Sequence, residues 1–304
     1  MIVPKGPDIR RLIAYVGQPL LLLFLYDVAV VLIYKVAHKE WIALPHIPVA
    51  LLGSAIGIIV SFRNNSAYAR WWEARTIWGA IVNNTRSYGR QVVTNIRWQK
   101  DGEEEAARMM QRDLIYHQIA FTNALRQHLR GLPPLDELHG LLPEDVLVDL
   151  AKQKNIPFAI QIRQGDLLRI ALERDWVDSL QWSALDATLN DFADAQGASE
   201  RIKNTPMPKQ YTFYPQLFVQ IFCLLLPLAL VQNMGWFTPL GSTLVGFIFL
   251  ALDKIGRDLE SPFDNTIYDI PLSNMSRGME INLRQAIGER HLPEPIQPVA
   301  GVLW

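Results

Sequence analysis

The residues able to do chemistry are spread thinly along this chain. It contains no glycine-rich phosphate loop, no Gly-x-Ser-x-Gly turn and no paired-histidine metal helix. Its six histidines are scattered, although Asp113 and His117 share a face of a predicted helix and His128 lies further along it. This spacing suits either a metal site or an ordinary solvated or core-edge face. The sequence therefore predicts no enzyme and no cofactor, and it assigns no metal site.

One carboxylate, Asp27, lies deep in an apolar segment. Acids inside a membrane usually face the helix bundle or water, and they often mark an ion path. The alternative is a structural hydrogen bond or ion pair with a neighbouring helix, and we favour this alternative. The position of Asp27 in the sequence does not by itself decide between an ion path and a structural contact.

The composition excludes several classes of protein. The 304 residues carry a net charge of -1, which argues against a nucleic-acid partner. Half of the residues are apolar, and the mean hydropathy is only slightly positive. The single cysteine, Cys223, lies in an apolar run, so no disulfide can form within the chain. The composition fits a chain that is part membrane protein and part water-exposed body.

Four segments approach the roughly 20 apolar residues that a membrane-spanning helix needs. They cover about 16–37, 47–62, 214–231 and 234–252. The second is short and can span only if its helix continues past Phe62, where no proline or glycine intervenes before Trp78. The third and fourth are separated only by Gln232 and Asn233, which predicts a helical hairpin.

Basic residues indicate the orientation of the spans. Lysine and arginine gather in the N-terminal segment, the long middle connection and the C-terminal tail. The two short connections carry only Lys39. Because positive charge stays on the cytoplasmic side, we expect both termini and the middle connection to be cytoplasmic. The N-terminal residues show no cleavage site, so we expect no cleaved signal peptide.

The remaining residues, about 63–213 and 253–304, are predicted to form a helical cytoplasmic body. Helical periodicity covers 103–130, and further helices are expected at about 143–153, from 155 to 174, and from Ser179 or Ser183 to about 204. Thr205-Pro-Met-Pro208 is a stiff elbow before the third span. The predicted fold is an all-α membrane protein with four transmembrane helices, forming a single domain over 1–304.

The second span carries a distinctive row of side chains. Ser54, Ile58 and Phe62 are four residues apart and share one helix face, which continues as Ser66 and Arg70. Such a row usually packs against another helix, and it can also line a pore. The spacing alone favours packing.

Three motifs, at the end of the second span, before the third span and after the fourth, resemble those of the bacterial bestrophin family. They are Ser61-Phe-Arg-Asn-Asn-Ser-Ala-Tyr-Ala-Arg70 with Trp72-Glu-Ala-Arg75 and Trp78-Gly79, then Glu200-Arg-Ile-Lys-Asn-Thr-Pro206, and Ser261-Pro-Phe263. The resemblance covers nearly the whole chain. It implies a homopentameric, passive ion channel of the bacterial inner membrane, in which five copies of the second span surround a narrow apolar neck.

The resemblance also assigns residues to the pore. The neck positions match Ser54, Ile58 and Phe62, and Ser54 departs from the three apolar residues that the family usually has. A second constriction, at the cytoplasmic exit, falls at Val177 or, next best, Leu180. The motif residues with a structural role are Arg63, Asn64, Asn65 and Arg70.

The resemblance leaves the conducted ion open. The family includes anion channels, and the resemblance to its bacterial members also allows conduction of monovalent cations. Four acids near the exit outnumber two arginines, which favours cations if they face the lumen: Glu173, Asp175, Asp178 and Asp186 against Arg169 and Arg174.

The expected partners are further copies of the chain, membrane lipids and monovalent ions. The acidic run of the animal calcium clasp is reduced here to Asp264 and Asp269, so we expect no calcium activation. The rival hypothesis is a membrane-anchored scaffold or sensor whose cytoplasmic helical body binds a partner.

Overall fold

A computed structural model gives the backbone of Met1 and residues 9–304 and the side chains of Met1 and residues 14–304. Within this part of the chain the structure is all helical, with two isolated bridges and no strand. The chain forms two compact units. The membrane unit consists of Pro4–Trp71 and Pro206–Ser261, and the body unit of Met1–Val3, Trp72–Thr205 and Pro262–Trp304.

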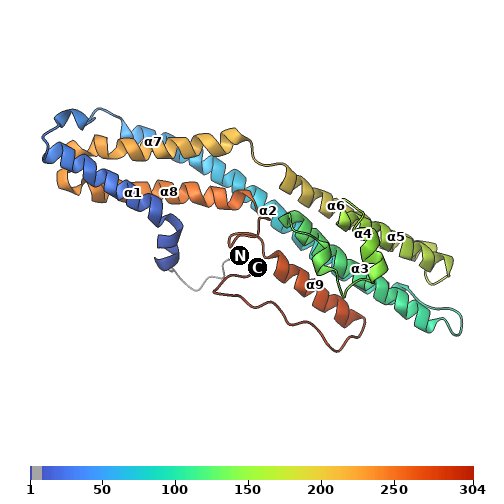
Figure 1. Cartoon of the computed structure of the whole chain (residues 1–304). Coiled ribbons are helices and arrows are strands. Elements are labelled where there is room, and N and C mark those ends of the chain that lie inside the picture. Colours follow the sequence, from blue (N-terminus) through green and yellow to red (C-terminus); the bar gives the residue numbers. More distant parts are fainter. Residues whose placement is uncertain (2–8) are drawn as a thin grey trace. The chain divides into compact units, whose positions relative to one another are not determined.

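The membrane unit is a bundle of long apolar helices (Figure 1). It contains α1 (Ile9–Lys35), the first part of α2 (Val49–Asn95), α7 (Lys209–Met234) and α8 (Thr238–Glu260). A short 3₁₀ helix, Glu40–Ile42, lies between α1 and α2. The buried side chains at its centre come from α1, α2 and α7: Leu23, Ile56, Val60, Val219, Phe222, Cys223 and Leu226.

Two stretches among the described residues are long and apolar enough to cross a membrane. They are Ala14–Lys35 and Lys209–Glu260, and the second comprises both α7 and α8. The turn between these two helices is the 3₁₀ segment Gly235–Phe237. Helix α7 ends before it because Gly235 has φ +53°, a conformation that glycine adopts easily. The hairpin therefore turns slightly later than expected, and Gln232 and Asn233 belong to α7.

Helix α2 confirms the expectation that the chain does not break after Phe62. It runs for 47 residues, from Val49 to Asn95. No proline interrupts this sequence, so every backbone N–H beyond the first turn has an acceptor one turn earlier. One helix therefore belongs to both units, and it leaves the membrane unit at Trp71.

The body unit is built around α3 (Glu104–Arg130). This helix packs against α5 (Ile156–Glu173), α6 (Ser179–Asn204) and α9 (Leu272–Ala286), and α4 (Glu144–Leu150) packs on α5. A 3₁₀ turn, Leu135–Glu137, follows α3. The second half of α3 is buried almost all round, from Leu114 to Leu129. The expected body helices are confirmed to within a few residues, and α9 was not predicted.

Candidate pore-lining helix

The part of α2 in the membrane unit has one buried face and one open face. Ile56 and Val60 are 9% and 1% exposed, and they pack with Phe222 of α7 in the unit's core. Ile58 and Phe62 point the other way and are 58% and 67% exposed. Large apolar side chains on an open face indicate a surface that something else covers.

The three expected neck residues lie together on this open face. Ser54 is exposed, as are Ile58 and Phe62 one and two turns further along. The Ser54 hydroxyl donates to the carbonyl of Ala50 at 2.8 Å, so its hydrogen is used within the helix. The row changes from apolar to polar beyond Phe62, where Ser66 is also exposed.

Arg63 is the buried anchor of α2. Its side chain is 2% exposed and ion-pairs with Asp253 of α8, whose side chain is 3% exposed, at 2.7 Å between Nη1 and Oδ1. Its Nη2 donates to the backbone carbonyl of Asp253. The other carboxylate oxygen of Asp253 pairs with Arg257 at 3.0 Å. A charge placed this deep is stable only because several groups compensate it together.

The rest of the motif extends this clamp between α2 and α8. Asn64 donates from Nδ2 to the carbonyl of Leu252 at 2.8 Å, and Arg70 donates from Nε to the carbonyl of Glu260 at 2.8 Å. Gly256 makes the close approach possible, since a Cβ there would lie 2.1 Å from the Asn64 amide oxygen. Asn65 lies outside the clamp and is exposed.

Asp27 occupies a buried position between α1 and α8. Its Oδ2 accepts a hydrogen bond from the Thr243 hydroxyl at 3.0 Å, and its side chain lies in the interior of the unit. Its other oxygen and the nearby Ser242 hydroxyl have no partner among the described residues. The contact with Thr243 is the structural role that the sequence favoured.

In the body unit, the Glu200–Pro206 motif contacts the start of the α2 segment and Asp264, the residue after the Ser261-Pro-Phe263 motif. Arg201 pairs with Glu73 of α2 at 2.6 Å, and Lys203 pairs with Asp264 at 2.7 Å. The Ile-Lys-Asn-Thr-Pro motif is thereby joined to the segment that follows the Pro-Phe motif.

The two acids left in the position of the calcium clasp are both engaged by protein groups. Asp264 holds Lys203, and Asp269 accepts hydrogen bonds from the backbone N–H and the hydroxyl of Thr266. Burial raises the pKa of Asp269, while the bonds from Thr266 oppose that rise. Neither carboxylate presents both of its oxygens to an incoming cation.

The expected exit constriction lies in the turn between α5 and α6. Asp175, at φ +60°, reverses the chain after α5, and the carbonyl of Trp176 accepts from the backbone N–H of Arg97 at 2.9 Å. Val177 is packed into the unit and is 4% exposed. Leu180, in the first turn of α6, is 81% exposed. Of these two candidates, only Leu180 has an exposed side chain.

The histidines considered as metal ligands make other contacts. The ring Nδ1 of His117 lies 2.7 Å from the backbone carbonyl of Asp113, and His128 lies 3.4 Å from a carboxylate oxygen of Glu200. Burial lowers the pKa of His117. Over the described residues, no three metal-ligating side chains come together.

The sequence analysis missed the partners of the motif residues. Asp253 and Gly256 complete the clamp between α2 and α8, and neither was predicted from the sequence. A signal was present for Asp253, because it is the first charged residue after an apolar run of α8.

Fold and site together define an all-helical membrane protein that presents one long helix with an uncovered face. The family model described as bacterial/fungal bestrophin protein matches residues 10–285. The chain belongs to this family.

Related proteins and solved structures agree. The chain is 34% identical over 308 residues to the voltage-dependent anion channel-forming protein YneE of Escherichia coli (strain K12), covering 98% of both chains. It is 32% identical over 301 residues to the voltage-dependent anion channel-forming protein RSc3414 of Ralstonia nicotianae, covering 97% of this chain and 96% of the relative. A crystal structure of a bacterial bestrophin homologue from Klebsiella pneumoniae matches with a TM-score of 0.82 and 30% identity, covering 90% of this chain and 98% of that one. The family and the relatives' names indicate an ion channel, not an enzyme.

Proposed function

We propose that five copies of this chain form a channel that passes monovalent anions down their electrochemical gradient. The observation that carries this proposal is the open face of α2. Ile58 and Phe62 are uncovered, while Ile56 and Val60 on the opposite face are packed. A ring of α2 helices would cover the open face and surround a narrow apolar neck at Ser54, Ile58 and Phe62.

Helix α2 is also the second of the four proposed spans. A bilayer core of about 30 Å needs roughly 20 residues of helix at about 1.5 Å each. The apolar residues end at Phe62, so the span extends through the polar motif to about Tyr68. The Arg63 clamp makes this possible, because it hides the charge of the arginine between α2 and α8.

The charges along α2 support anions over cations. From Leu51 to Ala69, the exposed side chains of α2 include no carboxylate. Beyond Trp72 the one acid on α2 is Glu73, and its charge is paired with that of Arg201. The neck itself does not select for the charge of the ion, because apolar rings exclude anions and cations alike by dewetting.

The acids that pointed toward cations are partly neutralised. Glu173 pairs with Arg169 at 2.6 Å. Asp178 caps α6 by accepting from the backbone N–H of Gln181 at 2.7 Å. Because Leu180 is exposed and Val177 is buried, we assign the exit constriction to Leu180 ahead of Val177. We give the engaged acids Glu173 and Asp178 no part in selectivity.

The proposed setting is the bacterial inner membrane, with both termini and the body in the cytoplasm. The clustering of basic residues supports this orientation. We also propose that calcium does not activate the channel, and the engaged carboxylates of Asp264 and Asp269 support this.

Reconstitution in liposomes tests the proposal. A chloride gradient should drive a flux without added energy, and the reversal potential should lie close to the chloride equilibrium potential. A reversal potential near that of the cation would reject anion selectivity. Folded pentamers that pass no ion would favour a scaffold or sensor, and a stable monomer in native mass spectrometry would reject the pentamer.

A further inference from the structure

A groove between α2 and α9 of the body unit has no role in the proposed conduction path. Its volume is about 720 Å³, within the range of small-molecule sites. Two stripes of side chains line it. The α2 stripe contains Arg75, Gly79, Val82, Asn83 and Arg86, and the facing residues are Asn274, Met275, Gly278, Met279, Ile281, Asn282 and Pro295.

The groove is cationic and contains no compensating acid. Arg75 and Arg86 are both exposed, and no carboxylate lines the groove. Among the described residues, no acid forms an ion pair with either guanidinium, whereas nearby Arg201 and Arg277 pair with Glu73 and Glu280. Two unneutralised guanidinium groups in one groove favour a negatively charged occupant.

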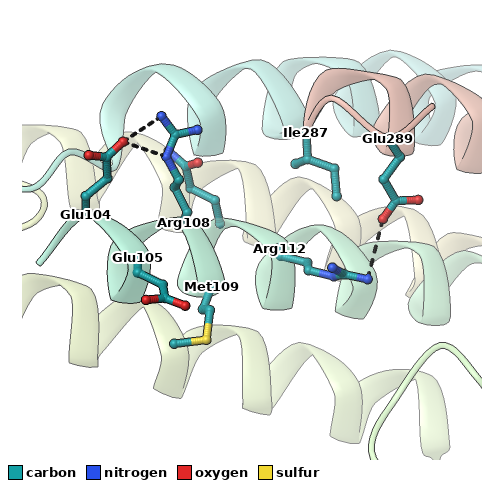
Figure 2. A pocket seen from close by; sticks show the side chains of 8 residues that line it. Glu104, Glu105, Arg108, Met109, Arg112, Ile287 and Glu289 are labelled. Carbon is teal, nitrogen blue, oxygen red and sulfur yellow. Dashed lines mark hydrogen bonds and ion pairs between the residues drawn. The ribbon is translucent and has the colours of Figure 1, made fainter.

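The pocket at the N-terminal end of α3 shows the contrast. Figure 2 shows Arg108 bonded to Glu104 and Arg112 paired with Glu289. Its arginines are already neutralised by acids that line the same pocket. That pocket therefore has no unpaired positive charge to attract an anion. The α2–α9 groove differs from it because its arginines have no acids beside them.

The distance between the two arginines of the groove indicates the length of the ligand. Arg75 and Arg86 are separated by three turns of α2, roughly 16 Å along the axis, so they lie on one helix face. A Cβ on Gly79 would lie 3.1 Å from Nη1 of Arg75, so this guanidinium lies along α2 beside the groove. A single small ion would contact one end only. An elongated anion can use both ends.

The remaining lining groups suit an organic phosphate. Asn83, Asn274 and Asn282 offer amide donors and acceptors for phosphate or hydroxyl oxygens. Val82 and Met275 offer apolar surface for a ring or carbon skeleton. A bare inorganic ion would leave this apolar surface unused.

We propose that the α2–α9 groove binds a soluble phosphate ester of nucleotide size, with Arg75 and Arg86 holding its anionic groups. A soluble source is favoured over a lipid, because Arg86 lies five turns of helix, roughly 27 Å, beyond Tyr68, where the proposed span ends. The site goes beyond the proposed ion conduction, and its test needs no measurement of current.

Isothermal titration calorimetry of the purified full chain in detergent tests the site. The probes are AMP, glycerol 3-phosphate and inorganic phosphate, with phosphatidic acid in mixed micelles as the lipid arm. We expect AMP to bind saturably and more tightly than inorganic phosphate. Arg75→Gln and Arg86→Gln should each weaken AMP binding about tenfold, as expected for a lost charge-assisted hydrogen bond.

Two further variants make the test specific. Gly278→Leu should abolish binding by filling the groove while keeping both arginines, since no atom lies within 4 Å of a Cβ placed there. Arg90→Gln removes an exposed charge from the same helix outside the groove, so AMP binding should not change. Size-exclusion profiles establish that each variant is folded.

Four outcomes would overturn the proposal. The first is the absence of saturable binding by either soluble ester, as expected if a neighbouring subunit fills the groove. The second is binding of phosphatidic acid alone. The third is an Arg90→Gln effect as large as that of Arg75→Gln. The fourth is AMP binding that survives Gly278→Leu.

Discussion

Removing the carboxylate of Asp253 should strongly destabilise the membrane unit. The Asp253→Ala change leaves the guanidinium of Arg63, 2% exposed, without its counter-charge in the interior. The backbone carbonyl of Asp253 would still accept a hydrogen bond from Arg63, but it cannot neutralise the charge. The arginine must then remain buried and unpaired, or α2 must move away from α8.

The expected effect is large for a single substitution. Breaking one partner of a buried ion pair destabilises a protein by about 3–5 kcal/mol. For chains of this general size, each kcal/mol lowers the melting temperature by about 2–4 °C. Asp253→Ala should therefore melt on the order of 10 °C below the wild type.

Two comparisons separate the buried pair from ordinary loss of charge. Arg257 binds the same carboxylate at 3.0 Å, but its side chain is 43% exposed. Arg257→Gln should lower stability by less than about 1 kcal/mol, as for other exposed pairs. The double variant Arg63→Met with Asp253→Leu removes both charges, and it should recover much of the lost stability.

Thermal unfolding of the detergent-purified chain, followed by tryptophan fluorescence, provides the measurement. The reasoning is refuted if Asp253→Ala melts within 2 °C of the wild type, measured at the same detergent concentration. It is also refuted if Arg257→Gln is as damaging as Asp253→Ala. A double variant less stable than either single variant would show that the pair acts by more than mutual neutralisation.

Three other predictions follow from the same contacts. Gly256→Ala places a Cβ 2.1 Å from the Asn64 amide oxygen, so it should lower the melting temperature, whereas Gly278→Ala should not. Calcium raised from nanomolar to micromolar should leave flux in liposomes unchanged, because Asp264 and Asp269 are engaged; a steep rise would contradict this. Burial lowers the pKa of His117, so the folded state prefers the neutral ring and loses stability as the pH falls through the unfolded value of about 6.5. His117→Gln should flatten the fall in melting temperature between pH 7.5 and 5, and an unchanged slope would count against this cause.

Local signals were sufficient to predict most of the helices. The Asn155-Ile-Pro157 start of α5 was readable because Asn155 accepts from the backbone N–H of Phe158 as an N-cap. The continuity of α2 past Phe62 followed from the absence of proline and glycine between Phe62 and Trp78. Helix α9 was missed because its buried positions, such as Met279 and Leu283, are sparse among polar residues.

Contacts between distant segments could not be predicted from the sequence. The row Ser54, Ile58 and Phe62 could be placed on one face by counting turns, but the structure was needed to show that this face is open. The partnership of Arg63 with Asp253 joins residues that are 190 positions apart. Periodicity within one helix carries no information about which carboxylate a second helix will bring to it.

Single-channel recording of Phe62→Ala tests the central claim most directly. If Phe62 closes an apolar neck, the smaller side chain should raise conductance and leave the reversal potential unchanged, because no charge is removed. Ile56→Ala is the matched control: Ile56 is 9% exposed and belongs to the core, so it should lower stability by about 2–4 kcal/mol with little change in conductance. Higher conductance in Ile56→Ala with no change in Phe62→Ala, both measured on intact pentamers, would contradict the account by placing another face of α2 on the pore axis.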